Sequence, residues 1–155
     1  MPKKSAGLLL YRRTHGALEV FLVHPGGPFW MKKDAASWSI PKGEFVGDED
    51  ALDAAQREFR EETGLESNGN YQPLTPIRQA GGKIVHAWTV ECDVDASAVK
   101  SNTFTIEWPM KSGNMREFPE VDRAEWFAME AARAKLLKSQ LPLLDELEIL
   151  LQSKT

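Results

Sequence analysis

The segment from Gly43 to Leu65, GEFVGDEDALDAAQREFREETGL, constrains the fold more than any other part of the chain. Acidic residues crowd positions 48–53, and Ala, Gln, Arg and further Glu residues follow. Acids favour a helix N-terminus because the helix dipole and the free amides attract negative charge. Gly64 is typical of a helix end. The segment therefore predicts a helix from about Glu49 to Thr63.

One side of this predicted helix is apolar and another is acidic. The apolar stripe, which we expect to face the core, consists of Leu52, Ala55 and Phe59. Glu58, Glu61 and Glu62 are spaced i, i+3, i+4 and share a different face within one turn. Like charges at this spacing repel one another, and a cation between them reduces that cost. Hard cations such as Mg²⁺ prefer carboxylate oxygens and keep water for substrate phosphates. The alternative is a solvated acidic face paired with nearby Arg and Lys residues.

The same segment resembles the Nudix box, whose pattern is Gly-x5-Glu-x7-Arg-Glu-U-x-Glu-Glu-x-Gly-U, with U a bulky aliphatic residue. The fixed positions that match are Gly43, Glu49, Arg57, Glu58, Glu61, Glu62 and Gly64. Phe59 is aromatic where the family prefers Ile, Leu or Val. With average residue frequencies, this agreement arises by chance roughly once in 10⁸. Nudix proteins hydrolyse diphosphate linkages with divalent metals.

The resemblance implies a role for each residue of the box. It assigns Glu58, Glu61 and Glu62 to metal binding, with Mg²⁺ as the expected ion and Mn²⁺ as a possible substitute. It makes Arg57 and Glu49 mainly structural, with Arg57 orienting the glutamates. The glutamate that takes a proton from the attacking water is left open among these carboxylates and one outside the box.

The residues just ahead of the box, Trp38-Ser-Ile-Pro-Lys-Gly43, look like the diadenosine-polyphosphate hydrolase branch and its MutT-like relatives. By this resemblance Lys42 lies beside the metal site and contacts a substrate phosphate. The alternative is a solvated lysine in a turn.

An acid in the loop before the last strand often completes the site in this family. The segment from Phe118 to Phe127 resembles that region, and Glu120 lies six positions before Trp126. We therefore expect Glu120 to act in catalysis, with Glu107 as a weaker candidate. Glu117 is a second weaker candidate, and an ordinary surface acid is the alternative for all of them.

Two residues between the box and Phe118 are further candidates for substrate contacts. Trp88 shares one face of a predicted strand with His86, because side chains two positions apart point the same way. That face is either the core or a substrate cleft, and in a cleft Trp88 would stack on a base. Arg78 is a candidate phosphate contact, with a surface charge as the alternative.

Apolar runs bounded by turn residues predict strands before and after the box helix. The predicted strands are Ser5–Tyr11, Leu18–His24, Ser37–Ile40, Lys83–Asp93, Thr103–Trp108 and Arg123–Met129. Helices are expected from about Glu130, with Pro142 near the start of the second. The leucines between residues 136 and 151 form a stripe that indicates packing on the sheet or, alternatively, a dimer seam. The fold class is α/β, and the resemblance implies an α/β/α sandwich with a mixed sheet in a single domain over residues 1–155.

The composition limits the remaining functional classes. The net charge of −4 argues against a stable nucleic-acid partner, which usually requires a basic surface. Cys92 is the only cysteine, which suits a reducing cytoplasm. Leu8-Leu9-Leu10 is too short an apolar run for a membrane span. We expect a cytoplasmic monomer or homodimer that acts on a small-molecule nucleotide.

The favoured function is divalent-metal-dependent hydrolysis of a diphosphate linkage in nucleoside polyphosphates, with dinucleoside polyphosphates such as diadenosine tetraphosphate as the expected substrates. Alternatives within the same chemistry are a pyrophosphohydrolase that clears damaged nucleoside triphosphates and an RNA 5′-pyrophosphohydrolase. The alternative from another class is a Nudix-fold nucleotide sensor without catalysis. Such a protein is expected to lose metal-binding glutamates, and this box keeps Glu58, Glu61 and Glu62.

Overall fold

The computed structural model describes residues 3–152 and is built around a mixed sheet. Its first strand, β1 (Lys4–Thr14), pairs antiparallel with β2 (Ala17–Pro25) and parallel with β6 (Ile84–Glu91). The last strand, β9 (Val121–Ala128), pairs antiparallel with β2. The sheet is therefore mixed, as the sequence predicts.

Three short strands extend this sheet. β3 (Lys42–Phe45) pairs antiparallel with the first residues of β1, and its pairing brings the segment before the box onto the sheet. β4 (Gln72–Pro73) and β5 (Ile77–Arg78) each pair antiparallel with β6. A short 3-10 turn, Ala80–Gly82, lies between β5 and β6.

Both faces of β1 are buried, which explains its continuous apolar sequence. Leu8 and Leu10 belong to the core cluster that contains Phe59 of the box helix. Leu9 and Tyr11 belong to the cluster that contains the C-terminal leucines. A strand covered on both faces gains nothing from polar residues at alternate positions, so its side chains are apolar throughout.

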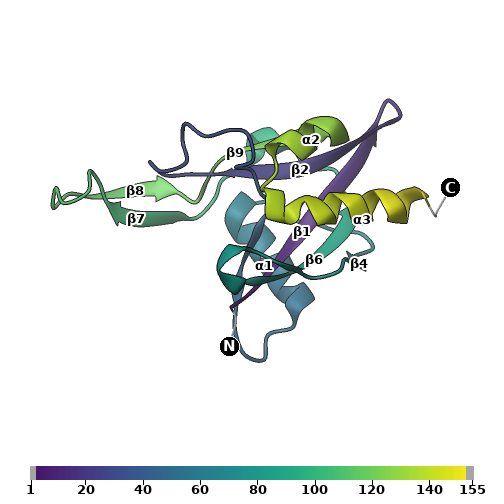
Figure 1. Cartoon of the computed structure of the whole chain (residues 1–155), viewed down its shortest axis with the longest axis horizontal. Helices are drawn as coiled ribbons and strands as arrows, with labels where there is room; N and C mark the ends of the chain where they lie inside the picture. The colour runs from purple at the N-terminus through teal and green to yellow at the C-terminus, as the bar shows by residue number, and fades with distance from the viewer. Residues whose placement is uncertain (1–2, 153–155) are drawn as a thin grey trace.

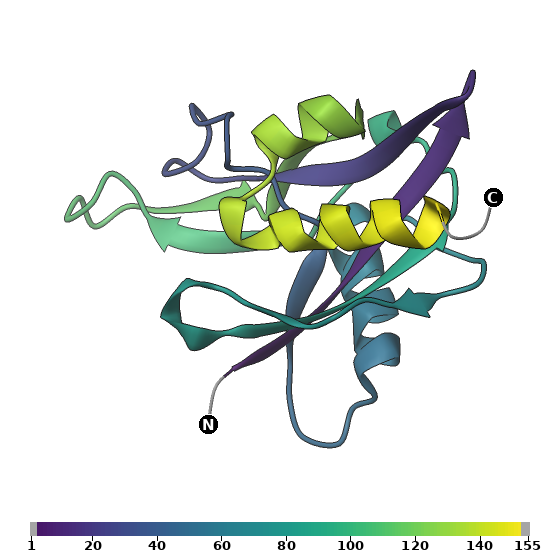
Figure 2. The same ribbon diagram turned by 45° about the vertical axis from the view of Figure 1, so that its right-hand side comes forward.

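Helices cover the two faces of the sheet. α1 (Ala51–Thr63) packs on one face, and α2 (Met129–Lys135) and α3 (Leu141–Gln152) lie on the other. Figures 1 and 2 show α3 crossing the front of the sheet while α1 lies behind it. This arrangement confirms the α/β/α sandwich. The C-terminal stripe packs on the sheet through buried leucines, namely Leu136, Leu143, Leu144, Leu147 and Leu151. Within residues 3–152, no helix combines the length and the apolar character needed to cross a bilayer.

α1 begins two residues later than the sequence predicts because Asp50 caps it. The Asp50 side chain accepts a hydrogen bond from the Asp53 amide at 3.1 Å. Asp50 itself has extended backbone angles, which is typical of a cap residue outside the first turn. At the other end Gly64 has φ 72° and its amide donates to the Arg60 carbonyl. The helix therefore ends at Thr63, as predicted.

A two-stranded arm projects from the body of the molecule (Figures 1 and 2). It consists of β7 (Thr103–Glu107) and β8 (Met115–Pro119), which pair antiparallel. Phe104 and Phe118 pack across the arm with ring centroids 6.1 Å apart. The sequence predicts β7 but not β8, because Met115-Arg-Glu-Phe-Pro119 is mostly exposed and lacks an apolar run.

The predicted strand at Ser37–Ile40 is wrong. Ser39 makes only an isolated bridge with Val23, while the amides of Ser37 and Trp38 donate to the Lys135 carbonyl before α3. The strand of this region is β3, which lies five residues later in the chain. Pro41 lacks the amide hydrogen that a continuous ladder through both segments would require.

Candidate active site

Gly43 on β3 lies against Glu58 in the middle of α1. A Cβ atom at position 43 would lie 1.9 Å from Oε2 of Glu58 and 2.1 Å from its carboxyl carbon. Any larger side chain at position 43 would displace the Glu58 carboxylate from this place. The glycine that opens the box therefore leaves room for the Glu58 carboxylate.

Arg57 binds three carboxylates at once. Its Nε and Nη2 donate to the two oxygens of Glu49 at 2.8 and 2.9 Å. Its Nη1 donates to Glu58 at 2.7 Å and to Glu61 at 3.2 Å. The paired bonds to Glu49 fix the plane of the guanidinium group, as expected for arginine with a carboxylate. Arg57 thereby orients Glu58 and Glu61, which agrees with the structural role expected from the sequence.

Glu62 is the most strongly perturbed carboxylate of α1. Its Oε1 accepts a hydrogen bond from the Lys42 amide at 3.1 Å. Burial nevertheless raises the pKa of Glu62 to about 8, with the charges of Glu120 and Glu58 adding to the rise. Burial also lowers the pKa of the Lys42 ammonium, and the neighbouring charge of Lys83 lowers it further. The two side chains lie in a poorly solvated site where charge is costly.

Glu120 approaches from the turn between β8 and β9. Its carbonyl accepts a hydrogen bond from the Gly26 amide at 2.9 Å. A Cβ at Gly26 would lie 2.1 Å from the Pro119 carbonyl oxygen, so this close approach also requires glycine. Although Glu120 is exposed over much of its surface, loss of solvent near its carboxyl group raises its pKa, and the charge of Glu61 adds to the rise.

The four carboxylates share one electrostatic environment. Burial raises the pKa of Glu58, and the charges of Glu61 and Glu120 oppose its ionisation, against the favourable effect of Arg57. The structure thus brings together the three box glutamates and the one that we expected from the opposite loop. Such crowding favours either protonation or a bound cation.

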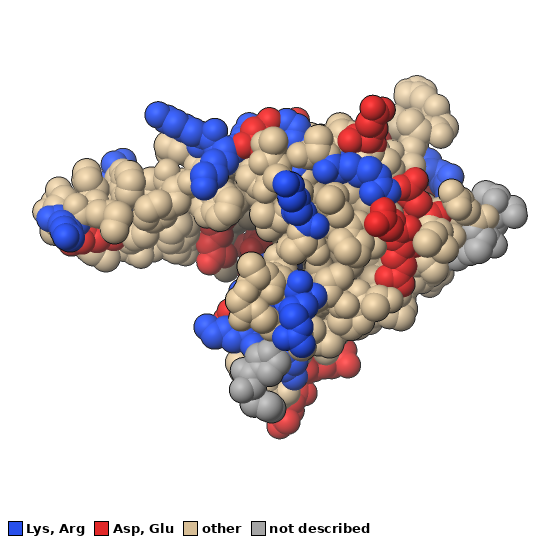
Figure 3. Space-filling model, in the orientation of Figure 1, with Lys and Arg blue, Asp and Glu red and all other residues tan. Residues whose placement is uncertain are grey.

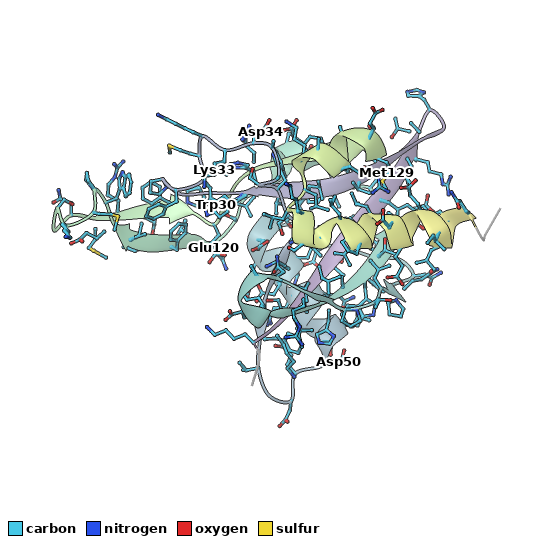
Figure 4. The ribbon with its side chains drawn as sticks, viewed as in Figure 1. Trp30, Lys33, Asp34, Asp50, Glu120 and Met129 are labelled. Atoms are coloured by element: carbon cyan, nitrogen blue, oxygen red, sulfur yellow. The ribbon has the colours of Figure 1, made fainter. Side chains whose placement is uncertain are left out.

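A cavity of about 200 Å³, which we call the site cavity, opens beside these carboxylates. Its lining residues are Val23, Pro25, Trp30, Ser37, Ser39, Lys42, Glu62, Glu120, Val121 and Leu137. Figure 3 shows acidic atoms in a recess at the base of the β7–β8 arm, where Figure 4 places Glu120 below Trp30. The cavity thus joins the acidic groups to an apolar wall.

Two expected substrate contacts lie elsewhere. Trp88 is in parallel register with Leu8 and packs against the core under α1, so it does not line the site cavity. Arg78 is exposed on β5, and its Nη1 lies 3.5 Å from the Gly82 carbonyl. Alternation along a strand identifies residues that share a face, but it does not say which face borders the site.

The weaker acidic candidates lie on the arm. The Glu107 carboxylate accepts hydrogen bonds from the amides of Lys111 and Gly113 at 3.0 and 3.1 Å, which closes the turn between β7 and β8. Glu117 is exposed on β8, where it pairs with Thr105. Neither residue lines the site cavity.

Sequence reasoning missed Trp30 and the structural role of Gly26. Both lie in the loop that begins with Pro25-Gly-Gly-Pro28, which the sequence marks only as a break in the chain. The sequence feature that could have identified Trp30 is the cluster Phe29-Trp-Met-Lys-Lys33. Aromatic residues in a loop can stack on a base, and neighbouring basic residues can bind phosphate.

Within residues 3–152, no three acidic, histidine or cysteine side chains already converge as metal ligands. The contacts of the carboxylates explain this arrangement. Arg57 occupies oxygens of Glu58 and Glu61, and the Lys42 amide occupies one oxygen of Glu62. The donor set still fits a hard divalent cation, since it consists of carboxylate oxygens whose charge Arg57 balances only in part.

Known proteins agree with this fold. The sequence matches the profile of the NUDIX domain over residues 1–147. A C. elegans Ap4A hydrolase in a binary complex is similar with a TM-score of 0.64 and 22% identity, covering 97% of this chain and 98% of that chain. The NUDIX domain of Shewanella oneidensis NrtR, complexed with ADP ribose, gives a TM-score of 0.67 and 18% identity over 97% and 89% of the two chains.

A mutT/nudix family protein from Listeria innocua is similar with a TM-score of 0.63 and 19% identity, over 99% of this chain and 97% of that chain. At these identities the structural likeness establishes the fold and not the substrate. No curated protein matches the sequence. The profile match covers most of the chain, however, and the protein therefore belongs to the Nudix family and is one of its pyrophosphohydrolases.

Proposed function

We propose that the protein hydrolyses dinucleoside polyphosphates, such as diadenosine tetraphosphate, with the help of Mg²⁺ or Mn²⁺. The observation that carries this proposal is the meeting of Glu58, Glu61 and Glu62 with Glu120 beside the site cavity. Four carboxylates from two separate elements repel one another, and a divalent cation would offset that repulsion.

Glu58, Glu61 and Glu62 are the residues that would hold the cation. Arg57 binds Glu58 and Glu61 in the structure, so its contacts would have to yield when the ion enters. A bound divalent ion would polarise the phosphoryl oxygens, acidify water and neutralise charge in the in-line transition state. Arg57 would remain anchored by its paired bonds to Glu49.

Glu120 is the residue that we assign as general base. Its side chain makes no hydrogen bond or ion pair with any residue from 3 to 152, whereas Glu58, Glu61 and Glu62 all have partners. Its pKa is raised, which strengthens it as a proton acceptor once it is ionised. Glu120 would take a proton from the water that attacks phosphorus.

Lys42 is the residue that favours a polyphosphate chain. It lines the site cavity next to Glu62 and Glu120, so its ammonium group can compensate a phosphate beside the carboxylates. A dinucleoside tetraphosphate carries several charges in a row, whereas ADP-ribose carries fewer. The similar C. elegans structure is named an Ap4A hydrolase, which agrees with this choice at the level of the fold.

The test is a substrate panel with Mg²⁺ and with Mn²⁺, in which products are identified by chromatography. Water attack on diadenosine tetraphosphate is expected to give ATP and AMP. The panel includes ADP-ribose, an oxidised deoxynucleoside triphosphate and a 5′-triphosphorylated RNA. A kcat/KM at least about tenfold higher for any of these would overturn the substrate assignment. Binding without hydrolysis of every compound would indicate a sensor.

The contribution of Lys42 can be measured in the same assay. Lys42→Ala is expected to raise KM more for diadenosine tetraphosphate than for ADP-ribose, because it removes charge that only the longer phosphate chain requires. Equal changes for both substrates would contradict the role of Lys42 in selecting a polyphosphate.

A further inference from the structure

Trp30 is the one aromatic side chain of the site cavity, among the residues that the structure describes. It lines the cavity together with Glu62 and Glu120, and 36% of its surface is exposed. Figure 4 places Trp30 directly above Glu120 at the base of the arm. An aromatic ring beside the acidic groups, and still partly open to solvent, offers an apolar π-surface next to the reaction centre.

The contacts around Trp30 hold its backbone in place. Its amide donates to the Gly27 carbonyl at 3.2 Å, and its carbonyl accepts from the Lys33 amide at 2.9 Å. The Lys33 carbonyl lies 2.6 Å from Nε2 of His24, which is fully buried at the end of β2. The Lys33 ammonium lies 4.9 Å from the centroid of the Trp30 ring and covers part of it. The backbone at Trp30 is thus hydrogen-bonded on both sides, and Lys33 lies over part of the ring.

The size and lining of the site cavity suit one end of a nucleotide. Its volume of about 200 Å³ is below the range of about 300–1,000 Å³ that is typical of pockets for whole drug-sized ligands. Apolar groups of Val23, Pro25 and Leu137 share its wall with Trp30. This apolar part of the wall suits a flat ring, and the charged groups of the same cavity are Lys42, Glu62 and Glu120.

We infer that the site cavity is a nucleobase subsite and that Trp30 is the surface on which the base stacks. This inference rests on the proposed function in one respect, namely that the ligand is a nucleotide. If a base stacks on Trp30, the attached phosphates would extend toward Lys42, Glu62 and Glu120, because these residues line the same cavity. Every base has a π-face, so stacking alone recognises nucleotides without selecting among them.

The serines of the cavity support recognition by stacking. Ser37 Oγ donates its hydrogen to the Asp34 carbonyl, and Ser39 Oγ donates to the Ile40 carbonyl. Ser39 Oγ also accepts from the Gln140 amide group. Their hydroxyl hydrogens are therefore committed to the protein, and we expect AMP and GMP to bind with affinities that differ by less than about tenfold.

Neighbouring aromatic residues do not serve this role. Phe29 does not line the cavity and packs against Trp108 with ring centroids 5.3 Å apart. Trp38 is fully buried and donates its indole hydrogen to Asp34. Phe29 is therefore a matched control, since it lies in the same loop and is also exposed.

The experiment measures the affinities of AMP and of ribose 5-phosphate, which lacks the base, by calorimetry with Mg²⁺ present. The wild-type protein is expected to bind AMP at least about fivefold more tightly, since stacking on an aromatic ring contributes about 1–3 kcal/mol per base. Trp30→Ala should bring the ratio of the AMP affinity to the ribose 5-phosphate affinity close to one, whereas Trp30→Phe should keep most of the preference for AMP. Phe29→Ala should leave the ratio unchanged.

Three results would overturn the assignment of Trp30. These are a wild-type protein without preference for AMP, a Trp30→Ala variant with an unchanged ratio, and a Phe29→Ala variant that loses the preference equally. A difference beyond about tenfold between AMP and GMP would contradict recognition by stacking alone. Because binding requires no turnover, a protein that binds AMP through Trp30 but cleaves no dinucleotide would contradict the proposed function and leave the base subsite intact.

Discussion

Glu61 and Glu120 are linked through the backbone of a single residue, Asn102. The Asn102 amide donates to the Glu61 carbonyl at 3.0 Å, and the Asn102 carbonyl accepts from the Glu120 amide at 2.8 Å. These bonds fix the turn between β8 and β9 beside the last part of α1. The position of Glu120 relative to the box is therefore set by the main chain, and small shifts of that chain should affect catalysis more than stability.

Gly26→Ala is expected to displace Glu120 and to lower kcat. The added Cβ would meet the Pro119 carbonyl oxygen at 2.1 Å, so the segment that carries Glu120 has to move. A misplacement of about 1 Å can reduce the rate about 10²-fold, and we expect a loss of at least about tenfold. Steady-state kinetics at saturating Mg²⁺ provide the measurement.

Gly113→Ala is the control for this change. Gly113 has φ 78° with nothing within 4 Å of an added Cβ, and it lies at the tip of the arm. Its substitution should reduce stability through backbone strain while leaving kcat within about twofold. An equal loss of kcat in both variants would show that any change in the arm lowers activity, and would contradict a specific role of the contact between Gly26 and Pro119 in placing Glu120.

Each of the changes Glu58→Gln, Glu61→Gln and Glu62→Gln should reduce kcat by at least about 10²-fold with the fold retained. A metal ligand contributes several kcal/mol of charge stabilisation in the transition state, and each 1.36 kcal/mol corresponds to about tenfold in rate. Glu66→Gln is the matched control, because Glu66 is exposed just beyond α1 and pairs only loosely with Arg60. Near-normal kcat for the Glu61 and Glu62 variants would remove the basis of the proposed metal site.

Glu120→Gln should lower kcat by about 10²–10⁴-fold, as expected for loss of a general base. The pH–rate profile should lose its acidic limb in this variant, because the limb reports ionisation of the base. Glu117→Gln on the neighbouring strand should have no such effect, since Glu117 is exposed on the arm. A damaging Glu117→Gln with an active Glu120→Gln would transfer the role to Glu117.

The stability of the metal-free protein should fall as pH rises from about 4.5 to about 8. Burial raises the pKa of Glu62 from 4.5 to about 8, so the folded form keeps a proton that the unfolded form releases over this interval. Below about pH 4.5 Glu62 is protonated in both the folded and the unfolded form, so it no longer reduces stability. Glu62→Gln should abolish this part of the decline in thermal unfolding midpoints measured with EDTA.

Magnesium provides the second arm of this experiment. At about pH 8 the ion should raise the unfolding midpoint of the wild-type protein, because it binds only the folded form. The shift should be clearly smaller for Glu62→Gln. Parallel pH profiles for wild type and variant, with equal shifts by Mg²⁺, would contradict the account of Glu62.

Most of the sheet and the box helix could be predicted from the sequence. The buried strands have long apolar runs, and α1 has a cap, an apolar stripe and a terminal glycine. β8 could not be predicted, because Met115–Pro119 is exposed and is stabilised mainly by its partner β7. The strand expected at Ser37–Ile40 was misplaced because local composition does not reveal where its backbone hydrogen bonds go.

The site was predictable only in part. Glu58, Glu61 and Glu62 follow from one helical turn, and Glu120 follows from its distance to Trp126. Trp88 and Arg78 were chosen by residue type, and the register of β6 places them away from the site cavity. Trp30 depends on how an irregular loop folds back over β2, which no periodic pattern encodes.

Equilibrium binding of Mn²⁺, followed by the loss of the free-ion signal in electron paramagnetic resonance, tests whether α1 carries a metal site. We expect the wild-type protein to bind Mn²⁺ without substrate and Mg²⁺ to compete for the same site. We also expect Glu58→Gln and Glu62→Gln to weaken binding by about tenfold or more, whereas Glu66→Gln should not. Equal Mn²⁺ affinity in all four proteins would contradict a metal site on α1.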